Sequence, residues 1–172
     1  MSDAPIEKTN AMRALEQRRI VYQAVRYGDP DEFHTAVEVA EMLGQPVEHV
    51  YKTIVVLRER GKPLLVMVQA DREIDLRRLA KATGDKKLQP ATLKEAERLT
   101  GLQVGGISAL ALLNKGFEPV IDASALRLDR VYVSAGRRGM QLGLAVTDLI
   151  KVTGAKVVTA TADEDGRDAA KV

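Results

Sequence analysis

The stretch Thr100-Gly101-Leu102-Gln103-Val104-Gly105-Gly106-Ile107-Ser108-Ala109-Leu110 places two adjacent glycines inside an apolar run that follows a predicted helix. A glycine pair permits backbone conformations and close approaches that a side chain would block. The loop can therefore direct its N–H groups toward a ligand. It can equally form a bulge or tight turn between packed elements, and the residues by themselves leave both interpretations open.

The composition restricts the classes of protein to consider. A chain of 172 residues is most simply one domain, long enough to bury a sizeable core. It has two Phe, four Tyr and no Trp, which argues against a reader of single strands that stacks bases on aromatic rings. A net charge of +2 means that any contact with nucleic acid depends on a local patch. The absence of cysteine excludes thiol nucleophiles, disulfides and cysteine-bound zinc.

The two ends of the chain differ in composition from the middle. Residues 1–8 lack the basic and apolar regions of a signal peptide, and no run of eighteen apolar residues occurs, so we expect a soluble, cytoplasmic protein. We expect residues 1–8 to be a disordered lead-in and residues 162–172 a disordered, charged tail. Residues 9–161 then form one domain without an internal linker or repeat.

Two capping boxes predict where helices begin. Thr35 precedes Glu38 by three residues, and Thr92 precedes Glu95 by three, so each pair can exchange hydrogen bonds with the other's backbone. Glycines that favour the left-handed region then end the predicted helices, which cover residues 35–43, 75–83 and 92–100. Two further short helices are predicted over residues 9–19 and 148–152.

Apolar, β-branched segments between these helices predict strands. We expect residues 51–57 and 63–68 to pair as a hairpin, and residues 135–139 to be the turn of another. The remaining predicted strands cover residues 20–27, 117–122, 130–134, 140–146 and 157–161. Many short strands with interspersed helices predict an α+β domain built on a mixed sheet.

Lys52 lies at the head of one predicted strand. Period-two alternation puts it on one face with Ile54 and Val56, while Tyr51 and Val55 occupy the other face. Because both faces are apolar, the strand is expected to be central. A lysine near the start of such a strand is then expected to point into a polar pocket. The alternative is a lysine that reaches solvent from the end of the strand.

Catalytic and DNA-binding motifs are weak in the sequence. His34 and His49 lack the spacing of metal ligands and are expected at the surface, and no serine has the flanks of a nucleophile elbow. Residues 37–51 imitate a helix-turn-helix, yet the second helix would offer only Glu48 and His49 to base edges. A DNA-binding regulator is therefore a distant alternative.

Basic residues are densest around the predicted helix over residues 75–83. They could contact phosphates or form an ordinary solvated face, because acidic residues are interspersed among them. The cluster comprises Arg72, Arg77, Arg78, Lys81, Lys86 and Lys87.

Several motifs, in order, resemble the YbaK family of bacterial aminoacyl-tRNA deacylases, which is related to the editing insertion of prolyl-tRNA synthetase. The likeness extends over about residues 9–161. It is carried by Lys52-Thr53, by the Gly-Gly-Ile-Ser loop from Gly105 to Ser108, by Tyr132-Val133-Ser134-Ala135-Gly136-Arg137-Arg138-Gly139, and by Asp148-Leu149. The resemblance implies an α+β domain around a mixed, barrel-like sheet surrounded by short helices, and hydrolysis of the ester of mischarged tRNA without a cofactor or metal.

The resemblance also implies roles for individual residues. The active-site set is Lys52, Gly105, Gly106, Ile107 and Ser108, with the loop N–H groups holding the aminoacyl moiety. The implied substrate-binding residues are Tyr27, Thr53, Ala109, Ser134, Gly136 and Asp148. If tRNA binds, its phosphates are expected to contact Arg77, Arg78, Lys81, Lys86, Lys87, Arg137 and Arg138.

Ala109 stands where the family's loop commonly has proline. Loss of a ring that fixes φ is expected to loosen the loop or reshape the pocket wall. The implied substrate is therefore Cys-tRNA(Pro) by default, with tRNA carrying alanine, serine or another small residue as alternatives. The expected partners are aminoacyl-tRNA and prolyl-tRNA synthetase or another synthetase, and no DNA or membrane. A second hypothesis is a non-catalytic module that binds tRNA or a synthetase.

Overall fold

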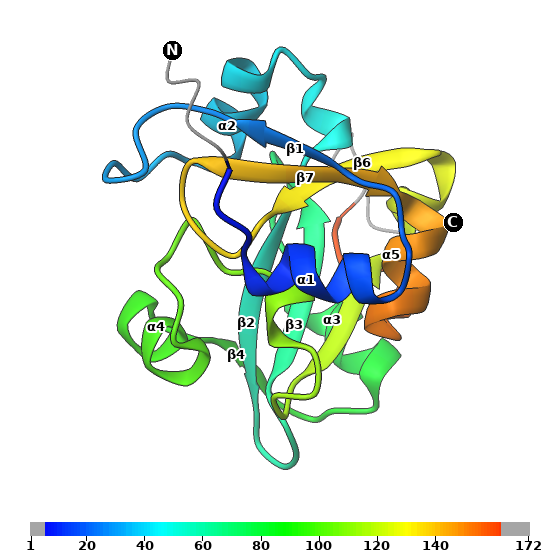
Figure 1. Ribbon diagram of the computed structural model, residues 1–172. Coiled ribbons are helices and arrows are strands. Elements are labelled where there is room, and N and C mark those ends of the chain that lie inside the picture. Colours follow the sequence, from blue (N-terminus) through cyan, green and yellow to red (C-terminus); the bar gives the residue numbers. More distant parts are fainter. Residues whose placement is uncertain (1–5, 163–172) are drawn as a thin grey trace.

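The computed structural model describes residues 6–162 and contains two β-sheets (Figure 1). The expected lead-in falls largely, and the expected tail almost entirely, outside the described residues. The strands are β1 (Gln23–Arg26), β2 (Tyr51–Arg58), β3 (Leu64–Gln69), β4 (Leu88–Pro90), β5 (Glu118–Asp122), β6 (Arg130–Ser134), β7 (Met140–Ala145) and β8 (Lys156–Val158). No helix in the described part of the chain is long and apolar enough to cross a membrane.

The strands form one sheet with the order β1-β7-β6 and another with the order β4-β2-β3-β5-β8. β2 and β3 pair antiparallel as the predicted hairpin, whereas β3, β5 and β8 run parallel, so the larger sheet is mixed as expected. The prediction of a barrel-like sheet is wrong, because the ladders do not close. The two sheets meet through one isolated bridge, between Val50 and Tyr132.

Within residues 6–162, five α-helices surround the sheets, and both predicted capping boxes are confirmed. The last helix begins at Val146, before the expected residue 148, and has no side-chain cap. In both capping boxes the threonine hydroxyl accepts from the glutamate N–H and the glutamate carboxylate accepts from the threonine N–H. Such caps each contribute about 1 kcal/mol to helix stability. The helices are α1 (Asn10–Gln17), α2 (Ala36–Leu43), α3 (Leu76–Thr83), α4 (Leu93–Thr100) and α5 (Val146–Thr153), with short 3₁₀ turns η1 (Val47–His49), η2 (Leu110–Leu112) and η3 (Ala123–Arg127).

β2 separates two apolar cores, as its alternation predicts. Tyr51 and Val55 pack into the larger core, which lies between the two sheets and is covered by α1. Val56 packs on the opposite face against Leu79 of α3. The strand is therefore held from both faces, and its position is fixed by burial as well as by hydrogen bonds.

Three strand predictions differ from the structure. β1 covers Gln23–Arg26 and is shorter than the expected residues 20–27. β4 was not expected, because it has only three residues and includes Pro90, which cannot donate to a ladder. β8 ends at Val158 and is shorter than expected, because the carboxylate of Asp122 accepts from the N–H groups of Ala160 and Thr161. These bonds satisfy backbone donors that would otherwise continue the strand.

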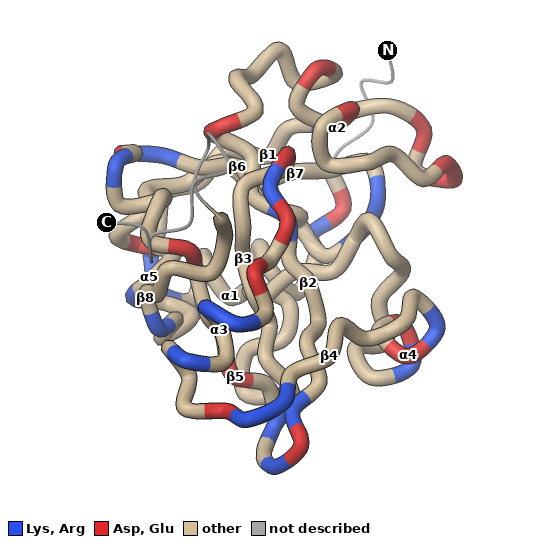
Figure 2. The backbone as a smooth tube through the Cα atoms, turned by 180° about the vertical axis from the view of Figure 1, so that it is seen from behind, with Lys and Arg blue, Asp and Glu red and all other residues tan. Residues whose placement is uncertain are grey.

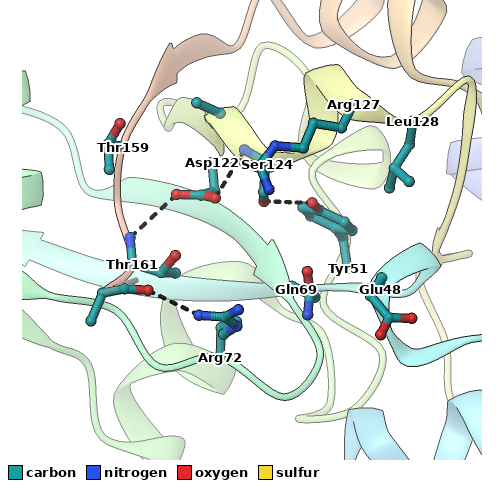
Figure 3. A pocket seen from close by; sticks show the side chains of 12 residues that line it. Glu48, Tyr51, Gln69, Arg72, Asp122, Ser124, Arg127, Leu128, Thr159 and Thr161 are labelled. Carbon is teal, nitrogen blue, oxygen red and sulfur yellow. Dashed lines mark hydrogen bonds between the residues drawn. The ribbon is translucent and has the colours of Figure 1, made fainter. Parts of the chain in front are cut away.

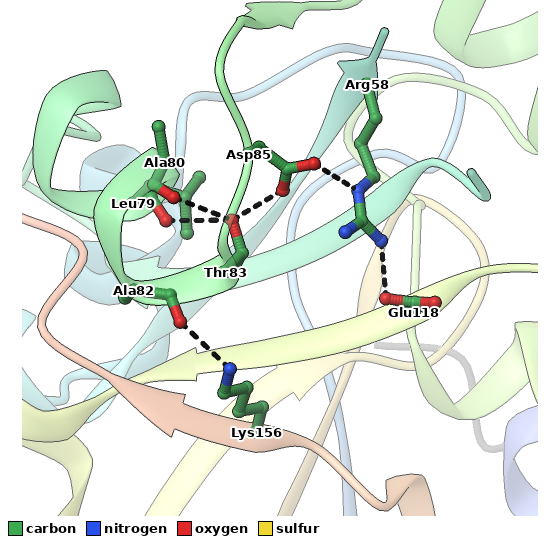
Figure 4. A network of polar contacts seen from close by, with 8 residues as sticks. All are labelled: Arg58, Leu79, Ala80, Ala82, Thr83, Asp85, Glu118 and Lys156. Carbon is green, nitrogen blue, oxygen red and sulfur yellow. Dashed lines mark hydrogen bonds and ion pairs between the residues drawn. The ribbon is translucent and has the colours of Figure 1, made fainter. Parts of the chain in front are cut away.

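A polar network joins β2 to the helix and strands beneath it (Figure 4). Arg58 Nε donates to Asp85 Oδ1 at 3.0 Å, and the same guanidinium pairs with Glu118. Thr83 Oγ1 donates to the other Asp85 oxygen at 2.6 Å. Although burial raises the pKa of Asp85, the hydrogen bonds from Thr83 and Arg58 outweigh burial and lower it below its usual value. The carboxylate is thus better stabilised in the folded chain than in the unfolded chain.

Replacing this carboxylate gives a pH-dependent prediction. We expect Asp85→Asn to lower the free energy of unfolding by about 1 to 3 kcal/mol at pH 7, because Arg58 loses its charged acceptor. Because the pKa of Asp85 is lower in the folded chain, the extra free energy of unfolding of the wild type over Asp85→Asn is fully present above the unfolded pKa of about 3.9. This difference is lost as pH falls through the folded pKa. Urea unfolding of both proteins between pH 2.5 and 7 measures this difference, and a pH-independent difference would contradict it.

Candidate active site

A cavity of about 190 Å³ lies along the open edge of β2. At one end of this edge Val50 bridges to Tyr132 of β6, and at the other Val55 accepts from the N–H of Ala91, which precedes α4. Among the described strands, none pairs with the edge between these points, so the cavity occupies a gap in the ladder. Its lining includes Phe33, His34, Lys52, Thr53, Gly105, Ile107, Ser134 and Gln141.

Lys52 contributes the cationic group of this cavity. Its side chain is 23% exposed, and its Nζ lies 3.5 Å from Glu73 Oε1. The Glu73 side chain is 94% exposed, so the ion pair is screened by water and contributes little stability. The ammonium group can therefore exchange this carboxylate for an oxygen of a substrate at small cost. Thr53 also lines the cavity, although it points to the other face of β2, because the cavity wraps around the strand edge.

The glycine loop forms the facing wall. Gly105 and Ile107 line the cavity, and Gly106 donates its N–H to Gln103 O at 2.8 Å. Among residues 6–162, no protein acceptor takes the N–H of Gly105 or of Ile107. These two backbone N–H groups are therefore the loop's candidates for contact with a ligand.

Close packing holds the loop against the turn between β6 and β7. A Cβ added at Gly106 would lie 2.8 to 3.0 Å from backbone atoms of Arg137 and Arg138, so only glycine fits. Arg138 Nε donates to Val104 O at 2.7 Å, and its guanidinium stacks over the Phe33 ring at 5.6 Å. The hairpin turn therefore fixes the loop from one side.

Gln141 and His34 have unsatisfied polar atoms in this cavity, and the sequence analysis missed both as site residues. Within the described chain, Gln141 Oε1 and His34 Nε2 are buried and have no hydrogen-bond partner. The nearest acid to His34 Nε2 is Glu32, at 3.7 Å, which is too long for a hydrogen bond. Gln141 lies opposite Ser134 in the β6–β7 ladder. A polar residue in an otherwise apolar return strand was the signal that could have identified Gln141.

Two residues of the predicted active-site set, Gly106 and Ser108, and several predicted substrate-binding residues lie outside the cavity lining. Tyr27 is buried and makes an edge-on ring contact with His34, with 6.5 Å between the ring centroids. Ser108 is buried and accepts from Ala111 N–H, and Ala109 packs in the larger core. Asp148 and Gly136 also lie outside the lining, the former in the first turn of α5 and the latter beside Ala111.

Over the described residues, no group of three or more His, Asp or Glu side chains is placed to hold a metal ion. What the cavity offers is one ammonium group, two backbone donors and an orphan amide oxygen. This set can bind an acyl group and stabilise a developing oxyanion.

Sequence comparison identifies the family. The model of the aminoacyl-tRNA editing domain matches residues 30–152. This chain belongs to that family. The editing-domain match covers β2, the glycine loop and the β6–β7 hairpin, which are the elements that build the cavity. The resemblance to YbaK-type aminoacyl-tRNA deacylases is thereby confirmed.

Relatives of this editing domain occur both as separate proteins and inside a synthetase. The chain is 34% identical over 158 residues to EbsC of Enterococcus faecalis, provisionally named a Cys-tRNA(Pro)/Cys-tRNA(Cys) deacylase, and the match spans 92% of this chain and 96% of EbsC. It is 25% identical over 139 residues to a proline–tRNA ligase of Staphylococcus aureus, spanning 81% of this chain but 24% of the ligase.

Solved structures show the same fold. The crystal structure of a protein provisionally described as a trans-editing enzyme for prolyl-tRNA synthetase superposes with a TM-score of 0.76 and 25% identity, covering 90% of this chain and 96% of that one. The hypothetical protein APE2540 superposes with a TM-score of 0.80 and 24% identity, covering 88% of this chain and 99% of that one. The α+β fold class is therefore confirmed, although the sheets stay open.

The basic residues expected to contact tRNA divide into two groups. Arg77, Arg78 and Lys81 lie on α3, and Lys86 and Lys87 follow it, and none of them lines the cavity. Figure 2 shows these basic stretches on and below α3, with acidic stretches beside them.

The second group, Arg137 and Arg138, lies in the turn that supports the glycine loop. Arg138 is engaged with Val104 and Phe33, and Arg137 pairs with Glu7 at 4.0 Å. Both arginines therefore have structural contacts at the edge of the site, whatever they contact in tRNA.

The contact at Gly106 gives a prediction. We expect Gly106→Ala to lower the free energy of unfolding by about 1 to 3 kcal/mol, since its Cβ would overlap the Arg137 backbone, and to abolish activity by displacing the loop. Gly44→Ala is the control, because its Cβ would have open space and only its positive φ is strained. Urea unfolding and an activity assay of both variants measure these effects. An active, fully stable Gly106→Ala protein would contradict the packing argument.

Proposed function

We propose that this protein is a trans-editing deacylase that hydrolyses the ester between a small amino acid and mischarged tRNA in the cavity beside β2. The single observation that supports this most is the meeting of Lys52, the open N–H groups of Gly105 and Ile107, and the orphan oxygen of Gln141 around one small space. Since charged tRNA is a cytoplasmic substrate, we also propose the cytoplasm as the place of action.

The proposed reaction uses the backbone donors to stabilise an oxyanion. Water attacks the ester carbonyl carbon, the carbonyl oxygen becomes negative next to the N–H groups of Gly105 and Ile107, and the C–O bond to the ribose then breaks. The products are the free amino acid and a tRNA with a free ribose hydroxyl. Each such donor contributes about 2.7 to 4 kcal/mol in a water-excluded site, or roughly two to three powers of ten in rate.

Lys52 and Gln141 position the two ends of the ester. The Lys52 ammonium is suited to oxygens of the ester or of the tRNA 3′ end, because it can leave the exposed carboxylate of Glu73. The buried Gln141 oxygen needs a donor, and the α-ammonium group of the substrate would supply it. An aminoacyl ester is already activated, so this positioning together with the oxyanion donors can replace an acid–base dyad.

The size of the cavity favours a small amino acid. At about 190 Å³ it is smaller than the pockets of drug-sized ligands, which begin near 300 Å³. EbsC is named for Cys-tRNA(Pro) and Cys-tRNA(Cys), so we propose cysteinyl-tRNA(Pro) as the first substrate to test. Alanyl and seryl esters are the next, because Ala109 replaces the family's proline at the base of the loop. The match to part of a proline–tRNA ligase supports prolyl-tRNA synthetase as a partner.

A panel of charged tRNAs tests the reaction. Cys-, Ala-, Ser-, Thr- and Pro-tRNA are incubated with the protein and ester loss is followed. We expect Lys52→Ala to lower the rate on the best substrate about tenfold to a hundredfold, the size expected for a lost charge-assisted contact. Lys151→Ala, on the exposed face of α5, is the matched control and should leave the rate unchanged.

Two outcomes would contradict the proposal in different ways. An undiminished rate for a folded Lys52→Ala variant removes the lysine from the mechanism. Saturable tRNA or synthetase binding without turnover of any ester would instead establish the alternative, a non-catalytic binding module. Loss of cysteinyl esters alone would assign the specificity of the site to cysteine.

Replacement of Gln141 by an apolar residue should raise stability and lower activity. We expect Gln141→Met to raise the free energy of unfolding by about 1 kcal/mol, since it removes an unsatisfied buried oxygen, while it lowers deacylation at least tenfold. Gln89→Met in β4 is the control for the same chemical change at an exposed position, with a stability change within about 0.5 kcal/mol. A destabilised Gln141→Met protein would show that the oxygen has a structural partner in solution.

A further inference from the structure

A second, larger cavity of about 370 Å³ opens beside Tyr51, the first residue of β2 (Figure 3). It lies outside the carboxyl ends of three parallel strands, because β3 ends at Gln69, β5 ends at Asp122, and Thr159 directly follows β8. All three residues line it. This edge of an open sheet is where α/β folds bind ligands, since successive strand ends leave a crevice between their loops.

The groups that face this cavity are rich in hydrogen-bond donors. Arg72 and Arg127 line it, and Figure 3 shows their guanidinium groups on opposite sides of the space. Arg72 Nη1 already donates to the carbonyl oxygen of Ala162 at 3.0 Å, so a bound phosphate would add to this contact. Tyr51 Oη and Ser124 Oγ are 2.7 Å apart and share one hydrogen bond, so one of the two hydroxyl protons remains for a ligand. Burial raises the pKa of Tyr51, which keeps its phenol protonated at neutral pH.

The carboxylate inside this cavity is already engaged. Asp122 Oδ1 accepts from Ala160 N–H at 2.7 Å and from Thr161 N–H at 3.2 Å, and Oδ2 accepts from Ser124 N–H at 3.0 Å. These three bonds offset much of its charge toward a bound anion. Glu48, the other acid of the lining, is exposed at the rim.

We propose that this carboxyl-edge cavity binds the phosphate group of a nucleotide between Arg72 and Arg127. Two guanidinium groups and a free hydroxyl match the acceptor oxygens of a phosphate, and the volume accommodates a small ligand. Leu128 adds an apolar wall against which a sugar or base can pack. The phosphate could belong to a free mononucleotide or to a nucleotide of tRNA, and the experiment below separates these sources.

Tyr51 gives the two cavities a common wall. It lines both of them, and Lys52 is the next residue of β2. Occupation of the carboxyl-edge cavity can thus bear on the position of Lys52 through one rigid strand. The proposal itself does not depend on ester hydrolysis, because it concerns the binding of a phosphate.

The first experiment titrates the full chain with adenosine 5′-monophosphate by calorimetry, with adenosine as the ligand that lacks phosphate. We expect saturable binding of the monophosphate and none of adenosine at the same concentration. Arg127→Gln should weaken binding about tenfold or more, whereas Arg60→Gln, the same change in an exposed turn, should not. Equal unfolding midpoints of the two variants show that Arg127→Gln is folded, and Ser124→Ala tests the hydroxyl pair independently.

The second experiment adds deacylated tRNA to the complex with the monophosphate. Displacement of the monophosphate, with tRNA affinity that falls in Arg127→Gln, identifies tRNA as the source of the phosphate. Simultaneous binding identifies a free nucleotide. If neither ligand binds more weakly to Arg127→Gln than to Arg60→Gln, the proposal is overturned. None of these measurements uses an aminoacyl ester, so their failure is distinguishable from failure of the proposed deacylation.

Discussion

The whole site depends on a strand that is buried on both faces but paired along only part of one edge. β2 is held by β3 over its length and by apolar cores on each side, so it cannot move to fill the gap. On the other edge, β6 contacts it at Val50 and β4 only from Val56 onward. The space between is closed by the glycine loop, and this enclosure brings backbone donors within reach of Lys52.

Much of this arrangement could be predicted because it is encoded locally. The capping boxes, the glycines after the helices and the β2–β3 hairpin depend on residues a few positions apart, so their signals survive in a single sequence. The alternation around Lys52 also predicted correctly that the strand is central. The glycine pair was ambiguous by itself; the packing of Gly106 on the Arg137 backbone supports the close-packing interpretation, and the ligand-binding interpretation remains a prediction.

The remainder could not be predicted because it depends on distant contacts. His34 was expected at the surface, yet the chain folds it beside Tyr27 and into the cavity. Asp148 was expected to bind substrate but lies in the first turn of α5, where a carboxylate is favourable in any helix. Its local sequence does not show that the cavity lies elsewhere. The two sheets meet only at the bridge between Val50 and Tyr132 in the described chain, and this partial pairing leaves them open. The carboxyl-edge cavity is formed by segments that follow three separate strands.

The open edge of β2 has a consequence for self-association. An unpaired strand edge is a template for pairing with another chain, and proteins commonly guard such edges with a lysine or a covering loop. Here Lys52 and the glycine loop stand at that edge. The residues that shape the pocket thus also cover part of the strand edge that a second chain would need for pairing.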